Sequence, residues 1–278
     1  MRRTVMTYIQ GGLGNQLFCY AFAYALAKMN NANLVIDLYE YERGYFREYQ
    51  LNRLCVEYKK KYNYHVPKLT IAIRNHFYYS EAKCYEEKEQ YFYDETVWGT
   101  KKTVFRGFWQ NERYFTNYKS EIINTFRLRN SADIACLNQA VSLLPKGNTV
   151  AVHVRRGDYV ELGRSIGREY YSNAFDEAER RIENALYVYF SDDIEWIKDN
   201  LPVDNQHMIF REVCDINDDL IELFVMSNCR HQVIANSTYS WWAAYLNQNK
   251  EKQVFVPNLE WLVERGFFLE EWIKVGIL

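Results

Sequence analysis

The stretch TVAVHVRRGDYV, residues 149–160, decides how the chain folds. Its first half, Val150 to Val154, is almost wholly apolar, which is typical of a strand buried in a parallel sheet. The apolar run then stops, and charged residues follow at once. Because ligands of open α/β sheets bind where the strands end on their carboxyl side, this stretch predicts an α/β protein with a binding site just after residue 154.

Two adjacent arginines, Arg155 and Arg156, dominate that expected site, with His153 before them and Asp158 after them. The planar guanidinium group binds phosphate oxygens in pairs and stays charged at any working pH. An ordinary solvated charge run is the alternative, but such runs seldom interrupt a valine strand and end in Gly-Asp. We therefore interpret the motif as a phosphate-binding site.

Composition sets the outer limits of function. The 278 residues suffice for two domains, and 48% hydrophobic content provides a substantial core. With 34 basic and 36 acidic residues, the net charge of −2 creates no general field that favours nucleic acid or an anionic membrane. The six cysteines lack C-x-x-C spacing, which suits the reduced thiols of a cytoplasmic protein. Since no window has the ~20 apolar residues of a membrane span, only peripheral membrane contact stays open.

A glycine turn follows the first expected strand, residues 5–9. The sequence GGLGNQ at 11–16 leads into an apolar, alanine-rich helix, with a spacing that fits neither a dinucleotide fingerprint nor a P-loop. One interpretation is a backbone at Gly12 and Gly14 that lies close to a ligand at the helix N-terminus, while Asn15 hydrogen bonds to that ligand. A tight turn with a polar cap explains these residues equally well.

The first half of the chain also contains a second expected strand, residues 33–37, and the resulting β-α-β unit requires a parallel sheet. Residues 40–100 are rich in Tyr, Lys and Glu, and we expect mostly surface helices there. A further strand is expected at 104–112, where Trp109 suits the floor of a sugar site or, more usually, a protein core. Turn residues at 145–147 mark the expected domain boundary.

Two acidic residues, Asp192 and Asp193, follow an expected strand at 187–190 and precede a helix. Acids in the first turn of a helix serve for capping and for the helix dipole, and this ordinary reading is strong here. The functional interpretation is a carboxylate that accepts hydrogen bonds from a guanine base or from ribose hydroxyls. Their position at the end of a strand moderately favours the functional interpretation.

A second polar cluster stands at the end of another expected strand, residues 233–235. Asn236, Ser237, Thr238 and Ser240 follow it directly and begin a helix. Hydroxyl groups and free backbone N–H groups at a helix N-terminus form a neutral cradle for phosphate. The tryptophans of this helix, at 241 and 242, are more usually core residues than ligand contacts.

Five stretches in chain order resemble the bacterial α-1,2-fucosyltransferases, a glycosyltransferase family of type 11. They are GGLGNQLF at 11–18, RGFWQNERYF at 106–115, HVRRGDY at 153–159, FSDDIEW at 190–196 and CRHQVIANSTYSWWAAYL at 229–246. Each stretch alone is a weak signal. Together they cover most of the chain, which makes the resemblance strong.

The resemblance implies a GT-B-like α/β fold, with two Rossmann-like domains facing each other across a cleft. Residues 1–147 would form an N-terminal acceptor-side domain, and residues 148–278 a C-terminal domain that binds GDP-fucose. It further implies transfer of L-fucose from GDP-β-L-fucose, with inversion, to the 2-hydroxyl of a terminal galactoside, in an oligosaccharide or a lipid-linked glycan. Assembly of O-antigen or another surface polysaccharide is the expected pathway. A nucleotide-sugar-binding protein, or a transferase with another donor or acceptor, is the alternative.

The resemblance also implies residue roles in donor binding. Arg155 and Arg156 would hold the diphosphate, and His153 would lie beside the nucleotide. Asp192 or Asp193 would contact the guanine or the ribose.

The remaining donor contacts implied by the resemblance come from both expected domains. Ser237, Thr238 and Ser240 would supply hydroxyl groups on the phosphate side. Asn15 and the glycine turn would face the donor from the first domain.

The expected chemistry needs no cofactor and no metal. Fucosyl transfer leaves negative charge on the β-phosphate, which two arginines and a helix N-terminus can stabilise. The chain contains no D-x-D pattern of the kind that holds a divalent ion in other sugar transferases. For the general base, Asp158 is the nearest carboxylate in sequence and Glu161 a weaker candidate. We favour a salt bridge from Asp158 that orients the arginines.

Overall fold

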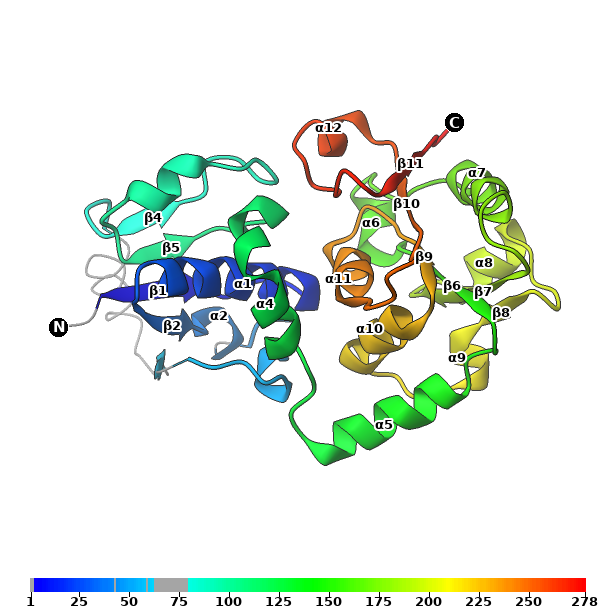
Figure 1. The fold of residues 1–278 in the computed structure, drawn as a ribbon, viewed down its shortest axis with the longest axis horizontal. Coiled ribbons are helices and arrows are strands. Elements are labelled where there is room, and N and C mark those ends of the chain that lie inside the picture. The colour runs from blue at the N-terminus through cyan, green and yellow to red at the C-terminus, as the bar shows by residue number, and fades with distance from the viewer. Residues whose placement is uncertain (1–2, 43, 59, 63–79) are drawn as a thin grey trace. The chain divides into compact units, whose positions relative to one another are not determined.

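The computed structural model describes residues 3–42, 44–58, 60–62 and 80–278. The chain divides into two compact units (Figure 1). Unit 1 comprises residues 1–129 with 265–267, and unit 2 comprises residues 130–264 with 268–278. The division therefore falls at 129/130 and not at the turn near residue 147. The intervening helix α5 (Ser131–Ser142) belongs to unit 2 because it packs against α10 (Asp219–Asn228).

Unit 1 is built on a parallel sheet whose described strands lie in the order β3-β2-β1-β5-β4. The strands are β1 (Thr4–Tyr8), β2 (Asn33–Asp37), β3 (Lys60–Tyr62), β4 (Cys84–Glu86) and β5 (Val104–Arg106). The helices are α1 (Leu13–Met29), α2 (Tyr39–Glu42) and α4 (Lys119–Thr125), with 3-10 turns η1 (Leu51–Arg53), η2 (Glu95–Gly99), η3 (Glu112–Tyr114) and η4 (Thr116–Tyr118). The parallel β-α-β unit expected from the sequence is confirmed.

The prediction of mostly surface helices over residues 40–100 is wrong for the described part of that range. It contains only short helical segments, and β3 and β4 extend the sheet on its two sides. The strand expected at 104–112 is also shorter, because pairing ends at Arg106. Residues 63–79 of this region lie outside the described residues.

Helix α1 is apolar on almost all sides, and thirteen of its 17 residues are buried. Alanine and leucine favour the helical backbone, and small side chains let the helix lie close to the sheet. Phe22 of α1 stacks on Trp109, with ring centroids 3.9 Å apart and planes 12° apart. Trp109 is fully buried, so it is a core residue and not the floor of a sugar site.

Unit 2 contains a second parallel sheet, in the order β11-β10-β9-β6-β7-β8. Its strands are β6 (Asn148–Val154), β7 (Ala185–Ser191), β8 (His207–Ile209), β9 (His231–Val233), β10 (Val254–Pro257) and β11 (Ile273–Val275). Its remaining helices are α6 (Gly157–Glu161), α7 (Arg168–Glu179), α8 (Ile194–Asn200), α9 (Phe210–Val213), α11 (Thr238–Leu246) and α12 (Glu260–Val263).

Helices cover both faces of the second sheet (Figure 1). Helices α7 and α8 bury Tyr170, Phe175 and Ile197 against Val150 and Val152 of β6. Helices α10 and α11 pack against each other on the other side, and the tryptophans at 241 and 242 are fully buried there. The β6 strand expected from its valines is thus the buried centre of the sheet, flanked by β9 and β7.

Candidate functional site

The register between β6 and β7 brings two polar motifs together. Val154 pairs with Ser191 as the last residue of each strand, and the Ser191 hydroxyl donates to the Val154 carbonyl over 2.8 Å. Arg155 and Arg156 therefore leave the sheet beside Asp192 and Asp193. Motifs that lie 37 residues apart in the chain meet because parallel strands end at one edge.

Arg155 is held by two carboxylates. Its two terminal nitrogens contact Asp192 Oδ2 at 2.6 Å and Asp158 Oδ1 at 2.5 Å. The ion pair with Asp158 is the geometry that the salt-bridge reading of Asp158 requires. The Arg155 side chain remains 21% exposed, so an anion has access to the guanidinium.

Arg156 is fixed through both its backbone and its side chain. Its backbone N–H donates to Asp192 Oδ1 over 2.9 Å, and its Nε donates to Asp193 Oδ2 over 3.1 Å. The guanidinium carbon lies 4.4 Å from the centroid of the Trp196 ring, a cation–π contact. Such fixing lowers the entropy that an arginine loses when it binds an anion.

The two aspartates of the neighbouring motif thus have distinct structural tasks. Asp193 caps α8, since its Oδ1 accepts from the Trp196 backbone N–H over 3.0 Å. Asp192 lies against Gly157, where a Cβ atom would approach its Oδ2 to 2.5 Å. Glycine at 157 therefore leaves the space in which Asp192 reaches the arginines.

His153 lies one residue before the end of β6 and is buried. Burial, and then the charge of Arg155, lower the pKa of its imidazole to about 3. Its Nδ1 atom has no hydrogen-bond partner among the described residues. The ring is therefore neutral near pH 7 and holds a buried polar atom that lacks a partner within the described chain.

The cluster after β9 lies at the same edge of the sheet, because β9 pairs with β6 from Val150 to Val152. Ser237 caps α11, and its Oγ accepts from the Tyr239 backbone N–H over 3.3 Å. The buried Ser240 hydroxyl donates back to the Ser237 carbonyl. These two hydroxyls therefore serve the helix start itself.

Asn236 and Thr238 flank the capping serine. Asn236 donates from Nδ2 to the Arg164 carbonyl over 3.0 Å, whereas its Oδ1 is buried without a partner among the described residues. Thr238 is the first residue of α11. The helix start bears no acidic residue in its first turn, so its N–H dipoles favour an anion.

The remaining predicted residues belong to unit 1. Gly11 adopts φ +79°, and Gly12 caps α1 with extended backbone. Gly14 lies within the first turn of α1, and Asn15 Oδ1 accepts from Gln110 Nε2 over 2.7 Å. The structure thus places Asn15, Gly12 and Gly14 at the carboxyl side of β1.

Several neighbours of these residues escaped the sequence reasoning. Arg156 lies over the ring of Trp196, and Arg155 lies over the ring of Tyr159. The Tyr159 hydroxyl bonds to the Ser237 side chain. A tryptophan one helical turn after Asp192-Asp193 was the available signal for the first contact. No sequence signal marks the second, since it depends on how α6 packs.

Glu87 is a further buried carboxylate in unit 1. Its oxygens accept from the backbone N–H groups of Phe108 and Trp109 over 2.7 and 3.0 Å. Burial raises its pKa to about 7. Trp109 has a positive φ of 57°, so Glu87 stabilises a turn that a non-glycine residue rarely adopts.

The arrangement in unit 2 combines two guanidinium groups, a helix N-terminus and two buried polar atoms without partners among the described residues. This combination suits a phosphorylated ligand whose charge is met by fixed donors. Within the described ranges, no three side chains of the His, Cys, Asp and Glu types come together as a metal site would require.

Comparison of the sequence with protein families gives one match over nearly the whole chain. The model of glycosyl transferase family 11 matches residues 5–276. An alpha-1,2-colitosyltransferase of Escherichia coli is 31% identical, with 98% of each chain covered. The O-antigen biosynthesis glycosyltransferase WbnK of Escherichia coli is 27% identical over 96% of this chain and 99% of its own. The galactoside alpha-(1,2)-fucosyltransferase 2 of Gorilla gorilla gorilla is 26% identical over 96% of this chain and 77% of its own.

Solved structures share the fold at low sequence identity. The NodZ alpha-1,6-fucosyltransferase co-crystallised with GDP superimposes with a TM-score of 0.56 and 13% identity, covering 88% of this chain and 92% of that one. The fucosyltransferase NodZ from Bradyrhizobium gives a TM-score of 0.51 at 14% identity, covering 87% of this chain and 92% of that one. The two parallel α/β sheets and this likeness confirm the GT-B-like fold class. Among helices of the described residues, none combines the length and apolar character needed to cross a membrane.

Proposed function

The chain belongs to glycosyl transferase family 11, and from this premise we propose that it transfers L-fucose from GDP-β-L-fucose to the 2-hydroxyl of a terminal galactoside. The reaction inverts the anomeric centre of fucose. Unit 2 binds the donor, and unit 1 supplies the acceptor side. The acceptor is the galactose end of an oligosaccharide or a lipid-linked glycan.

Relatives that match almost end to end support this choice of reaction. Their names specify alpha-1,2 transfer in one bacterial case and galactoside alpha-(1,2)-fucosyl transfer in the mammalian case. A further bacterial relative is named for O-antigen biosynthesis, which favours surface polysaccharide as the product. The enzyme would then work where nucleotide sugars are made, in the cytoplasm, with peripheral contact to a membrane-bound acceptor.

The observation that carries the proposal is the pair of restrained arginines at the end of β6. Departure of fucose leaves negative charge on the β-phosphate of GDP, and this charge grows as the glycosidic bond breaks. Arg155 and Arg156 are already fixed by Asp158, Asp192 and Asp193. Fixed donors stabilise the transition state without reorganising during the reaction. We therefore assign leaving-group stabilisation to the arginines and positioning to Asp158.

The N-terminus of α11 supports a second set of donor contacts. The N–H dipoles of its first turn, with the side chains of Ser237, Thr238 and Ser240, would face a phosphate. Asn236 Oδ1 and His153 Nδ1 would gain the polar partners that they lack among the described residues. The donor diphosphate would thus be bound by side-chain charge and by a helix end.

Recognition of the base falls to Asp192 or Asp193. Their carboxylate oxygens each accept one hydrogen bond within unit 2. A carboxylate oxygen has room for another donor, such as a guanine N–H. On the side of unit 1, Asn15 and the backbone of Gly12 and Gly14 would complete the donor site.

A second candidate donor is GDP-linked colitose, because the alpha-1,2-colitosyltransferase is 31% identical to the chain. Colitose lacks a hydroxyl group that fucose carries. A site that hydrogen bonds this hydroxyl discriminates strongly against the sugar without it. The donor is therefore decided by comparing turnover of the two sugars.

The deciding experiment incubates the protein with GDP-fucose and lactose and measures both released GDP and a fucosylated trisaccharide. We expect both products, with activity that survives exhaustive chelation. GDP-colitose and UDP-galactose serve as alternative donors in parallel. Binding of GDP-fucose without any trisaccharide would favour a binding protein, and restoration by Mg²⁺ after loss with EDTA would reveal a missed metal site.

A further inference from the structure

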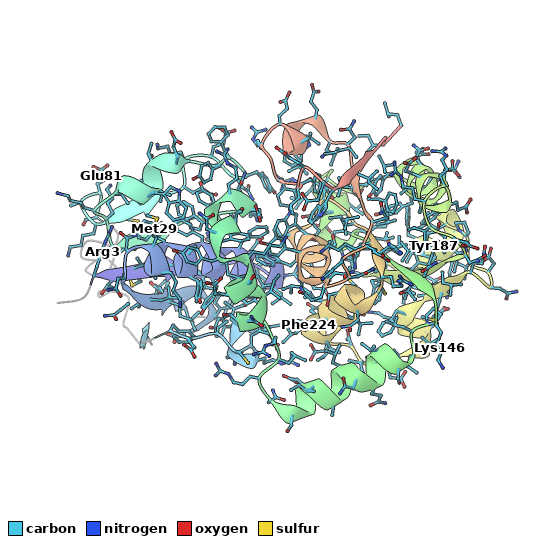
Figure 2. The ribbon with its side chains drawn as sticks, viewed as in Figure 1. Arg3, Met29, Glu81, Lys146, Tyr187 and Phe224 are labelled. Carbon is cyan, nitrogen blue, oxygen red and sulfur yellow. The ribbon has the colours of Figure 1, made fainter. Side chains whose placement is uncertain are left out.

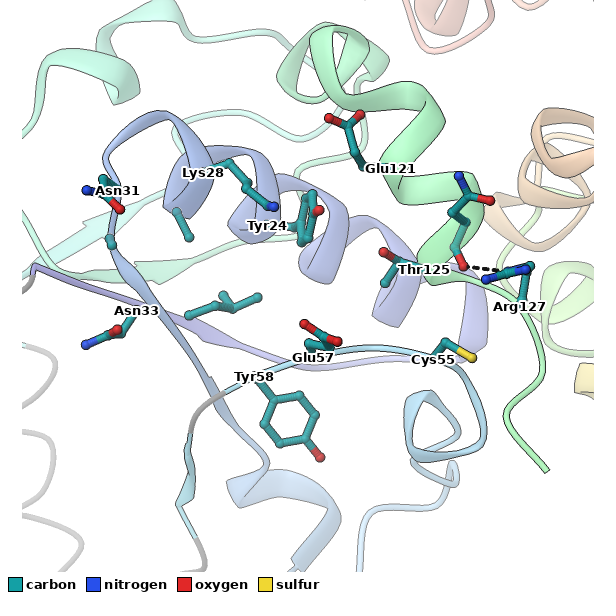
Figure 3. A pocket seen from close by; sticks show the side chains of 14 residues that line it. Tyr24, Lys28, Asn31, Asn33, Cys55, Glu57, Tyr58, Glu121, Thr125 and Arg127 are labelled. Atoms are coloured by element: carbon teal, nitrogen blue, oxygen red, sulfur yellow. Dashed lines mark hydrogen bonds between the residues drawn. The ribbon is translucent and has the colours of Figure 1, made fainter.

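Unit 1 carries a groove of about 800 Å³ (Figure 3), and none of the residues that line it is a candidate donor residue of that unit. Its walls come from the second half of α1, the start of β2, residues 55–58 and α4. Since β2 begins at Asn33, the groove lies where strands start, whereas the glycine turn lies where β1 ends. Figure 2 labels Arg3, Met29 and Glu81, which precede β1, end α1 and precede β4 and therefore mark the end of unit 1 at which these strands start.

The charged side chains of the groove balance one another. Lys28 and Arg127 contribute two positive charges, and Glu57 and Glu121 contribute two negative charges. The Tyr24 hydroxyl, and then the charges of Glu121 and Glu57, raise the pKa of Lys28, so both carboxylates act on this ammonium group. A site without net charge does not select a phosphorylated or acidic ligand.

The same side chains keep hydrogen-bonding capacity. Neither Glu57 nor Glu121 forms an ion pair within the described part of the chain. Arg127 donates from Nε to the Asn124 carbonyl over 3.0 Å, which leaves its other guanidinium N–H groups for a ligand. Acceptors and donors therefore alternate around one hollow, which matches hydroxyl groups that both donate and accept.

Tyrosine rings add apolar surface to this polar lining. Tyr24 carries Lys28 over its ring at 5.1 Å, and Tyr58 lines the opposite wall (Figure 3). Both side chains are only partly buried. Aromatic surface beside polar groups suits the C–H faces and the hydroxyls of a sugar ring.

We propose that this groove binds a neutral oligosaccharide, namely the part of the acceptor glycan that does not react. This inference rests on the proposed function, which assigns the acceptor to unit 1 and the glycine turn of that unit to the donor site. Tyr24 follows Gly12 by twelve residues, a rise of about 18 Å along α1. A disaccharide whose galactose reacts with the donor beside the glycine turn does not span that length, whereas a glycan of several sugars does. The groove therefore selects acceptors by length.

The first test compares two acceptors of the same chemistry, N-acetyllactosamine and the linear neutral hexasaccharide tri-N-acetyllactosamine. The variant Glu57→Gln/Glu121→Gln removes both carboxylates, which are exposed, so the fold is retained. We expect kcat/KM for the hexasaccharide to fall about tenfold or more, since a hydrogen bond to a charged group contributes more than one to a neutral group. The value for the disaccharide stays within twofold.

The matched control is Glu81→Gln/Glu95→Gln, which changes the charge equally at two exposed carboxylates of unit 1 outside the groove. This control should leave both acceptors unchanged. Equal losses for both acceptors in the groove variant, or no loss for either, would overturn the proposal.

The second test measures binding without turnover. Calorimetric titration with tri-N-acetyllactosamine, in the absence of any donor, should show binding that Ala32→Trp abolishes by filling the groove. Circular dichroism and melting temperature verify the fold of this variant. Failure of the proposed function would appear as no fucosyl transfer to N-acetyllactosamine, while this titration would still report on the groove. Hexasaccharide binding that survives both groove variants contradicts the inference.

Discussion

Each unit places a turn directly after a parallel strand, yet the two turns are built from different interactions. In unit 2, the turn after β6 presents charged side chains that carboxylates of a neighbouring strand end hold in place. In unit 1, the turn after β1 is glycine backbone, and the Gly11 carbonyl accepts from the Tyr41 hydroxyl over 2.6 Å and from Gln16 Nε2 over 3.2 Å. The turn after β6 is held by ion pairs, and the turn after β1 is held by hydrogen bonds to its backbone.

The difference bears on where a bound ligand would gain the most free energy from new hydrogen bonds. At the glycine turn, the buried Gln16 amide bonds to the backbone of Gly11, Glu48 and Gln50, so it joins the turn to residues 48–50. At the end of β6, His153 Nδ1 and Asn236 Oδ1 are buried without partners among the described residues. A buried polar atom without a partner costs on the order of 1–3 kcal/mol, and a ligand that supplies the partner recovers it. Unit 2 also carries the two restrained arginines that the proposed diphosphate binding requires.

The largest expected effect comes from removing the charge network of unit 2. Replacing Arg155 and Arg156 together by alanine should lower kcat by more than 10²-fold, because preorganised donors to a leaving group contribute that much. Arg156→Lys keeps the charge but loses the paired donors, and we expect about 10²-fold for it. The measurement is steady-state kinetics, in which kcat falls more than the donor KM rises.

The matched control for these variants is Arg180→Ala. Arg180 forms an ion pair of the same type with Glu177, at 2.6 Å on exposed helix surface. Its loss should leave kcat unchanged. A kcat near wild type in the double arginine variant would mean that the motif serves only the fold.

The next effect concerns the glycine turn of unit 1. Gly11→Ala should destabilise the protein by about 1–3 kcal/mol, because φ is +79° and the new Cβ would meet Asn15 Nδ2 at 2.5 Å. Gly12→Ala is the control, since φ is −71° and nothing lies within 4 Å of its Cβ position. Denaturant unfolding measures both variants.

Kinetics of the Gly12 variant then sharpen the comparison between the turns. If the donor lies close to the Gly12 backbone, Gly12→Ala raises the donor KM while stability holds. An unchanged donor KM would remove the glycine turn from the donor site and leave it a purely structural feature.

The two units should also respond to pH in opposite directions. The folded pKa of Glu87 is raised from 4.5 to about 7, so its stabilising contribution is complete below 4.5 and is lost as pH rises through 7. The folded pKa of His153 is lowered from 6.5 to about 3, so its contribution is complete above 6.5 and is lost as pH falls below that value.

Unfolding free energies of Glu87→Gln and His153→Gln between pH 5 and 8 separate these contributions. We expect each variant to remove one pH-dependent change in the free energy of unfolding, on the order of 1–3 kcal/mol across this pH range. Glu87→Gln should reduce the loss of stability at high pH, and His153→Gln should reduce the loss of stability at low pH. Identical pH profiles of wild type and both variants would contradict the burial of these two groups.

The smallest expected effect is the preference for the base. If Asp192 or Asp193 accepts from guanine, GDP should raise the melting temperature a few degrees more than UDP or ADP at equal concentration. Single Asp192→Asn and Asp193→Asn variants identify which residue is responsible. Equal shifts from all three nucleotides would restrict the aspartates to positioning the arginines and capping α8.

Sequence reasoning reached further in unit 2 than in unit 1. The valine run and the arginines predicted β6 and the polar cluster at its end, because a buried strand and a charged terminus are both local signals. In unit 1, the described part of residues 40–100 contains short strands that form only by pairing at the sides of the sheet. Such strands have little local signal, so they were missed.

The sequence by itself determined that the chain is an α/β protein with an arginine motif after a buried strand, and its motifs determined the family. Only the tertiary structure decided that Arg155 meets Asp192, that Trp109 stacks on Phe22, and that His153 Nδ1 lacks a partner among the described residues. The physical reason is the separation along the chain of the residues that interact. Strand propensity and capping depend on neighbours in the chain, whereas ion pairs, burial and pKa values depend on which strands lie adjacent and in which register.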